Sequence, residues 1–127
     1  MAQKIALIED DEILSKFLFE ELKAAGFDIQ LFGDGEAGLA GVRNIKPDLV
    51  LLDLVIPKKT GMEVLQELKA DTMTQAIPVI VITMNSDDET LKKALGLGAN
   101  DYFIKSQHPI AEIVEKIKQF FFGLLHF

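Results

Sequence analysis

The chain has 127 residues, with 20 acidic and 13 basic side chains, a formal net charge of −7 and no cysteine. This length fits a single domain, and a hydrophobic content of 49% is enough for a buried core, which excludes a disordered acidic tail. The negative charge argues against direct binding of nucleic acid, which needs basic side chains, and the missing cysteines exclude disulfides, thiolate zinc sites and a cysteine nucleophile.

Short apolar runs alternate with helical stripes along the chain. The runs predict strands at 5–8, 28–32, 49–52, 78–82 and 102–104, and the stripes predict helices at 12–25, 35–45, 61–70, 87–97 and 109–122. Gly26 and Gly98 stand where the first and fourth helices should end. Gly38 and Gly41 lower the helix propensity of the second helix, so we expect it to be the weaker one.

This strict alternation of strand and helix indicates the α/β class. Strands that are apolar throughout predict a parallel sheet covered by helices on both faces. We therefore expect a three-layer (βα)5 domain, doubly wound around a five-stranded parallel sheet in the order 2-1-3-4-5, which is the flavodoxin-like arrangement.

Polar side chains stand at the predicted carboxyl ends of four strands, the edge where open parallel sheets bind ligands. In chain order they are Glu9, Asp10 and Asp11, then Asp53, Thr83 and Lys105. Because the first and third strands should be neighbours, we expect Asp10 and Asp53 to converge.

Most of these residues also have an ordinary structural explanation. Asp11 is better explained as the N-cap of the first helix than as a ligand, and Asp10 alone can be a turn residue. Thr83 and Lys105, taken singly, are common at strand ends. Asp53 is different, because it interrupts the apolar segment 49–56, and a buried carboxylate is costly unless it is paired or binds a metal. It is the conjunction of these residues that predicts a site.

Their combined chemistry points to phosphoryl transfer. Converging carboxylates without thiols or paired histidines favour a hard cation, chiefly Mg²⁺. A lysine and a hydroxyl beside such a cation suit the oxygens of a phosphoryl group. Asp53 can be the nucleophile that forms an acyl phosphate. Ser15 lies on a predicted helix, and Ser86 and Ser106 lack a histidine base, so no other nucleophile competes.

Four segments, in order and with their spacings, resemble the receiver domains of response regulators, which include the chemotaxis regulators. They are 8–11 (Ile-Glu-Asp-Asp), 53–61 (Asp-Leu-Val-Ile-Pro-Lys-Lys-Thr-Gly), 81–83 (Val-Ile-Thr) and 102–105 (Tyr-Phe-Ile-Lys), and Glu63 follows at the family's spacing. The resemblance covers essentially the whole chain. It implies a single receiver domain over 1–127, which can be the N-terminal part of a longer regulator.

The resemblance also implies a role for each residue of the acidic site. Asp53 matches the phosphoacceptor, and Lys105 matches the lysine that pairs with the phosphoryl group. Asp10, Asp53 and the backbone carbonyl of Val55 match the ligands of Mg²⁺. Glu9 matches the neighbouring acid that acts on the metal through water.

The function implied is a phosphoacceptor signalling switch of a two-component system or phosphorelay. The phosphoryl group would come from the phosphohistidine of a sensor histidine kinase or a phosphotransfer protein, and the chain would be no enzyme beyond its own phosphorylation and dephosphorylation. Thr83 matches the switch hydroxyl and Tyr102 the switch aromatic, which change the face formed by the fourth helix, fifth strand and fifth helix. We expect that face to bind a downstream protein or a second copy of the chain. The kinase, the pathway and the target stay open.

Three positions near the site bear on its behaviour. Ser106 replaces the proline that usually follows the lysine, so the Lys105–Ser106 bond is either a strained cis bond or trans, and the loop can aim Lys105 differently. His108 is expected to be an ordinary exposed loop histidine. Val55 is apolar where, together with Asn85, the family tunes the lifetime of the acyl phosphate, so we expect a long lifetime.

Two other functions stay open from the sequence. A degenerate receiver that binds partners without phosphorylation would have the same fold, although the complete pocket argues against it. An aspartyl-phosphate phosphatase would need a second acid where Val55 stands, and a cap domain for its substrate.

The end of the chain is rich in phenylalanine, with four of the nine in the last eight residues. Helical spacing explains Phe120 and Phe121 as core residues. It does not explain Phe122, Leu125 and Phe127, which either fold back onto the domain or extend an apolar docking surface. No signal peptide is visible and no apolar run approaches the roughly 20 residues that span a bilayer, so we expect a cytoplasmic protein without a membrane partner.

Overall fold

A computed structural model describes residues 2–84 and 87–124. Strands and helices alternate throughout the described chain. In order they are β1 (Lys4–Ile8), α1 (Glu12–Ala24), β2 (Asp28–Phe32), α2 (Gly35–Ile45), β3 (Leu49–Asp53), α3 (Gly61–Ala70), β4 (Val79–Thr83), α4 (Asp88–Gly96), β5 (Asp101–Ile104) and α5 (Ile110–Leu124).

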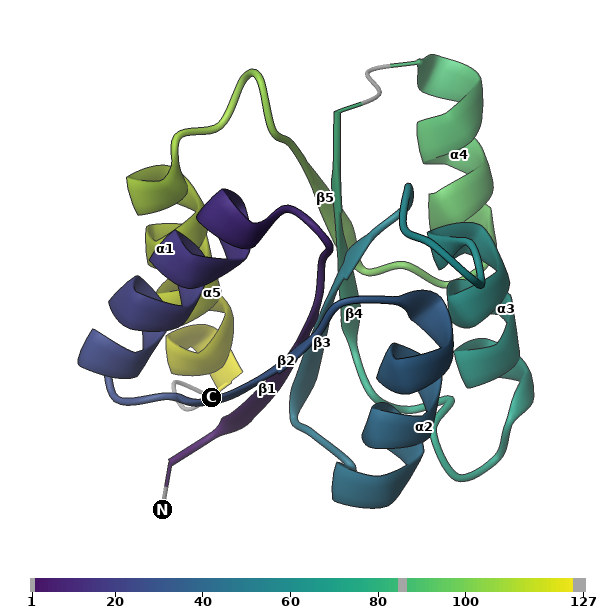
Figure 1. Cartoon of the computed structure of the whole chain (residues 1–127), viewed down its shortest axis with the longest axis horizontal. Coiled ribbons are helices and arrows are strands. Elements are labelled where there is room, and N and C mark those ends of the chain that lie inside the picture. Colours follow the sequence, from purple (N-terminus) through teal and green to yellow (C-terminus); the bar gives the residue numbers. More distant parts are fainter. Residues whose placement is uncertain (1, 85–86, 125–127) are drawn as a thin grey trace.

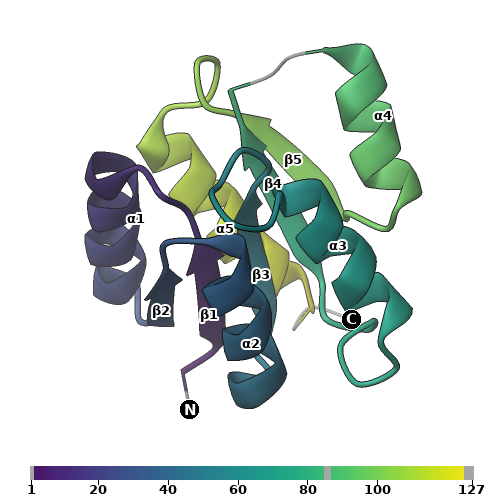
Figure 2. The ribbon, with the colours of Figure 1, turned by 45° about the vertical axis from the view of Figure 1, so that its right-hand side comes forward.

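The five strands form one parallel sheet in the order β2-β1-β3-β4-β5. Helices α1 and α5 cover one face of the sheet, and α2, α3 and α4 cover the other (Figure 1). Figure 2 shows β2 and β5 at the two margins, with the three central strands between them. The predicted three-layer flavodoxin-like arrangement is therefore confirmed.

The core lies in two layers, one on each face of the sheet. Alternate residues of each central strand contribute to opposite layers, as the pleat of a strand requires. In β1, Ile8 packs with the layer under α2 and α3, whereas Leu7 packs with the layer under α1 and α5. Every residue of β3 and β4 is buried, which explains why these strands are apolar without alternation.

The glycines of α2 serve close packing. A Cβ atom on Gly38 would lie 2.6 Å from Cδ1 of Ile8, and one on Gly41 would lie 2.2 Å from Cζ of Phe32. The residues that lower the helix propensity of α2 therefore let it approach β1 and β2 closely.

Some helix boundaries differ from prediction by one or two residues, and a cap explains the start of α4. The side chain of Asp87 accepts a hydrogen bond from the Glu89 amide, so Asp87 is the N-cap of α4 and not its first residue. Gly26 ends the first helical segment with a φ of +99°, as expected for a glycine after a helix.

The phenylalanines at the end of α5 divide as expected. Phe121 is buried and lies 5.2 Å from the ring of Phe27, and Phe120 packs partly against the same layer. The side chain of Phe122 is 62% exposed. Leu125 and Phe127 lie outside the described residues, as does Asn85. No helix within 2–84 or 87–124 has the length and apolar character needed to cross a membrane.

Helix α3 begins with a capping box immediately after the loop that follows Asp53. The hydroxyl of Thr60 accepts a hydrogen bond from the Glu63 amide, and the Glu63 carboxylate accepts one from the Thr60 amide. These two bonds satisfy amides that the first turn of a helix otherwise leaves without partners.

Replacing Thr60 with alanine should therefore lower the free energy of unfolding by about 1 kcal/mol. Urea denaturation measures this change. Thr72, an exposed threonine in the loop after α3, provides the control, and Thr72→Ala should change the free energy by less than about 0.5 kcal/mol. Equal effects of the two substitutions would show that the cap does not stabilise α3.

Candidate functional site

The carboxyl ends of β1, β3 and β5 meet around one pocket of about 290 Å³, at the end of the sheet that is uppermost in Figure 1. The residues that line it are Glu9, Asp10, Asp11, Asp53, Val55, Met84 and Lys105. One carboxylate oxygen from each of Glu9, Asp10 and Asp53 lies within 4.8 Å of the others. The predicted convergence of Asp10 and Asp53 is therefore confirmed.

Lys105 forms ion pairs with the two buried carboxylates, those of Glu9 and Asp53. Its Nζ lies 3.0 Å from Oδ2 of Asp53 and 2.9 Å from Oε2 of Glu9. Burial lowers the pKa of the Lys105 ammonium, but its hydrogen bonds with Glu9 and Asp53 outweigh burial and raise the pKa above the ordinary value. The lysine is thus a cation aimed into the site, and the Lys105–Ser106 bond that follows it is trans.

Asp53 is held by its backbone surroundings as well as by Lys105. Its side chain is buried at the end of β3, and Oδ1 accepts a hydrogen bond of 3.1 Å from the Val55 amide. The amide of Gly61 donates to the carbonyl of Leu54, and a Cβ atom on Gly61 would lie 2.2 Å from the carbonyl oxygen of Asp53. Only glycine allows α3 to start this close to Asp53.

Glu9 is buried, and its two carboxylate oxygens have different surroundings. Its Oε1 accepts hydrogen bonds from the Asp11 amide and from Nζ of Lys105, whereas Oε2 is buried and lies at ion-pair distance from Lys105 without an aligned hydrogen bond. Burial, and then the hydrogen bond with Asp53, raises the pKa of Glu9 from 4.5 to about 7. The ionised form of the Glu9 carboxylate is therefore disfavoured in the folded protein.

The donor set fits a hard divalent cation. Glu9, Asp10 and Asp53 offer carboxylate oxygens, the ligand type that Mg²⁺ prefers, and Asp10 is exposed at the rim where it can reach an ion from solvent. The buried Oε2 of Glu9 is ion-paired with Lys105 without an aligned hydrogen bond, so a cation or its water could add a contact there. Residues of this kind in this arrangement form an acidic metal-binding cluster.

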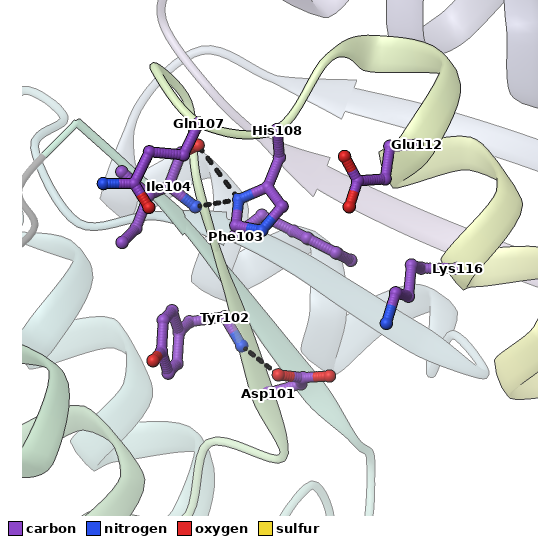
Figure 3. A pocket seen from close by; sticks show the side chains of 8 residues that line it. All are labelled: Asp101, Tyr102, Phe103, Ile104, Gln107, His108, Glu112 and Lys116. Carbon is purple, nitrogen blue, oxygen red and sulfur yellow. Dashed lines mark hydrogen bonds between the residues drawn. The ribbon is translucent and has the colours of Figure 1, made fainter.

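Two predicted site residues lie outside this pocket. Thr83 is fully buried at the end of β4, where its carbonyl accepts a hydrogen bond of 2.8 Å from the Lys105 amide. Tyr102 is half-buried on β5. It packs against the same core layer as Ile8, which lies under α2, α3 and α4. Its side chain lines a second pocket at the open edge of β5 (Figure 3).

Asp11 is the N-cap of α1, as expected, because its side chain accepts hydrogen bonds from the amides of Ile13 and Leu14. Met84 was missed, although its place directly after Thr83 could have put it at the same edge. The expectation of an exposed His108 was wrong. This side chain is half-buried, and its Nδ1 lies 3.0 Å from the Ile104 amide nitrogen.

Comparison with known proteins decides the family. Residues 5–118 match the response regulator receiver domain. The chain belongs to this family. Receiver domains are signalling modules of two-component systems rather than enzymes.

Individual relatives agree with this assignment. The receiver domain is 36% identical over 118 residues to the DNA-binding response regulator MtrA of Mycolicibacterium paratuberculosis, an alignment that covers 93% of this chain and 51% of MtrA. The chain thus spans about half the length of this relative. It superposes with a TM-score of 0.86, at 31% identity, on the phosphorylated cyanobacterial phytochrome response regulator RcpA, with 94% of each chain covered.

A further structural relative bears on the metal. The receiver domain of sensor histidine kinase PA1611 from Pseudomonas aeruginosa is 26% identical, with a TM-score of 0.84 and coverage of 97% of this chain and 99% of that one. That relative has a magnesium ion coordinated in its active-site cleft.

The raised pKa of Glu9 predicts how the stability of the metal-free protein depends on pH. The folded state binds the proton of the Glu9 carboxyl more tightly than the unfolded state does. The protonated carboxyl therefore adds to the free energy of unfolding, and this contribution is fully present below about pH 4.5 and is lost as pH rises through about 7. The loss should be a few kcal/mol.

Chemical denaturation in EDTA between pH 4 and 8 measures this effect, with Glu9→Gln as the control. The difference in free energy between wild type and Glu9→Gln should change across this range, because the variant has no carboxyl to titrate. Parallel curves for the two proteins would contradict the prediction.

Proposed function

We propose that this receiver domain is a phosphoacceptor switch, in which Asp53 takes a phosphoryl group from the phosphohistidine of a histidine kinase or phosphotransfer protein. The observation that carries the proposal is the buried Asp53 carboxylate, which lies between a lysine ammonium and two further carboxylates at the carboxyl edge of the sheet. A purely structural ion pair would not need the additional acids, which repel one another unless a cation is bound.

The chemistry follows from the contacts of Asp53. A carboxylate oxygen attacks phosphorus and forms the acyl phosphate, while the bond from phosphorus to the histidine nitrogen breaks and the imidazole leaves with the electron pair. The Val55 amide and Lys105 hold the carboxylate in a defined orientation. Lys105 can pass from the carboxylate to the phosphoryl oxygens, where its charge offsets theirs.

Mg²⁺ is the proposed cofactor, and when bound it supplies positive charge that offsets the phosphoryl oxygens. Asp10, Asp53 and the backbone carbonyl of Val55 are its proposed ligands, with Glu9 acting through water. In the resting protein these acids need the cation to relieve their repulsion.

The proposed output is a change of the surface formed by α4, β5 and α5. Thr83 lies at the end of β4, next to β5 in the sheet. Its carbonyl already accepts a hydrogen bond from the amide of Lys105. Movement of its hydroxyl toward a phosphoryl group on Asp53 would open space that the Tyr102 ring enters from β5. A downstream protein or a second copy of the chain would read the altered surface.

The central test is phosphorylation by acetyl phosphate in the presence of Mg²⁺, followed by intact mass. Wild type should gain one phosphoryl group, and Asp53→Asn should gain none because the amide is no nucleophile. Asp28→Asn is the matched control, since Asp28 lies at the opposite end of the sheet on β2 and should leave the modification unchanged.

The outcome separates the candidate functions. Failure of wild type to gain a phosphoryl group would refute the switch and favour a receiver that binds partners without phosphorylation. Modification that persists in Asp53→Asn would place the acceptor elsewhere in the chain.

The side chain of Val55 is 73% exposed beside the pocket, so it meets water that could attack the acyl phosphate. An apolar side chain cannot hydrogen-bond and orient that water, whereas an amide can. We expect Val55→Asn to lose its phosphate faster than wild type after excess phosphodonor is removed. Time-resolved mass spectrometry measures the two half-lives, and a half-life in Val55→Asn equal to or longer than that of wild type would contradict the prediction.

A further inference from the structure

The loop after β5 folds back onto the last residue of the strand. β5 lies at the margin of the sheet, and the amide of Lys105 points inward and donates to the carbonyl of Thr83 on β4. Backbone groups of successive strand residues point to opposite sides. The amide and carbonyl of Ile104 therefore face the open edge, where a strand has no neighbour to pair with.

The loop itself satisfies both groups of Ile104. The carbonyl accepts hydrogen bonds from the amides of Gln107, at 2.9 Å, and His108, at 3.0 Å. The amide lies 3.0 Å from Nδ1 of His108. Figure 3 shows the imidazole lying over the end of β5, with both contacts converging on the same ring nitrogen.

The geometry indicates which tautomer the ring adopts. Nδ1 also lies 3.1 Å from the Ile104 carbonyl oxygen, so it could in principle accept from the amide or donate to the carbonyl. That carbonyl oxygen already accepts hydrogen bonds from two backbone N–H groups, which use both of its lone pairs. The Ile104 amide, in contrast, needs an acceptor, and Nδ1 lies opposite it. The ring proton therefore belongs on Nε2.

The ring is also fixed by packing. It meets Phe103 edge-on, with centroids 5.5 Å apart and an angle of 72° between the planes. The rest of the ring borders the pocket at the open edge, together with the charged side chains of Asp101, Glu112 and Lys116.

We propose that His108 is a positioning residue for Lys105, and that it acts through the hydrogen bond from the Ile104 amide to Nδ1. Ser106 follows Lys105, so no proline ring restrains the backbone at that point. The imidazole supplies the restraint instead, because it anchors the residue before Lys105 while Thr83 anchors the amide of Lys105 itself. The Nζ atom is thereby held at 3.0 Å from Asp53.

This inference rests on the proposed role of Asp53 as phosphoacceptor, and two variants separate the hydrogen bond from the packing. In His108→Asn, the amide oxygen takes the place of Nδ1 and can accept from Ile104, while the contact with Phe103 is lost. In His108→Leu, an apolar side chain still packs on Phe103 but offers no acceptor.

The measurement is the initial rate of Asp53 phosphorylation by acetyl phosphate at saturating Mg²⁺, together with the Mg²⁺ dissociation constant and hydrogen exchange of the Ile104 amide. His108→Leu should be slower than wild type by about tenfold, since small displacements of a charged group are costly in rate. Its Ile104 amide should exchange faster, and the saturating Mg²⁺, checked against the dissociation constant, keeps any change of metal affinity out of the rate. His108→Asn should keep most of the phosphorylation rate, and its Ile104 amide should stay protected from hydrogen exchange.

Three results would overturn the inference. They are a wild-type rate in His108→Leu, an equal loss of rate in both variants, and a long-range ¹H–¹⁵N spectrum in which Nδ1 carries the proton. Wild type that is not phosphorylated would instead refute the proposed function, whereas the exchange and tautomer measurements would still report on the hydrogen bond.

Discussion

The structure depends on a balance of charge at one edge of a buried sheet. Glu9 and Asp53 are taken out of water at the ends of β1 and β3, and the ammonium of Lys105 approaches both. Because a buried carboxylate is costly without a partner, the chain must bring Lys105 to this place from the far margin of the sheet. One cation does not compensate three acids, and the surplus negative charge is what makes the edge receptive to a metal ion.

Close backbone contacts between neighbouring elements keep Asp53 and Lys105 in place at this edge. Gly61 lets α3 begin against the carbonyl of Asp53, and the capping box of Thr60 and Glu63 secures the same turn. On the other side, β4 receives the Lys105 amide and the loop after β5 folds onto Ile104. The acidic residues thus lie on or directly after neighbouring central strands, and the lysine comes from the margin of the sheet, where the loop that follows it contacts Ile104.

Much of the fold and of the acidic site could be predicted from the order of residues in the sequence. The apolar runs predicted the strands because both faces of each central strand are buried, and Asp53 stood out because it interrupts such a run. Asp10 and Asp53 could be predicted to converge because parallel strands end at one edge. The predicted boundaries of α4 differed by one residue at each end, since a cap such as Asp87 is defined by where its side chain bonds and not by residue type alone. His108 was misjudged for a similar reason, because its hydrogen bond depends on the path of the loop.

The sequence by itself determined the fold class and the set of acids at the sheet edge, because hydrophobic periodicity and strand ends are local properties of the chain, and its four motif segments carried the resemblance to receiver domains. Only the tertiary structure decided the pKa of Glu9, the aim of Lys105 and the contact of His108 with Ile104. These depend on burial and on distances between residues as far apart in the chain as Glu9 and Lys105, and distances of that kind are set when the five strands come together and not by any segment alone.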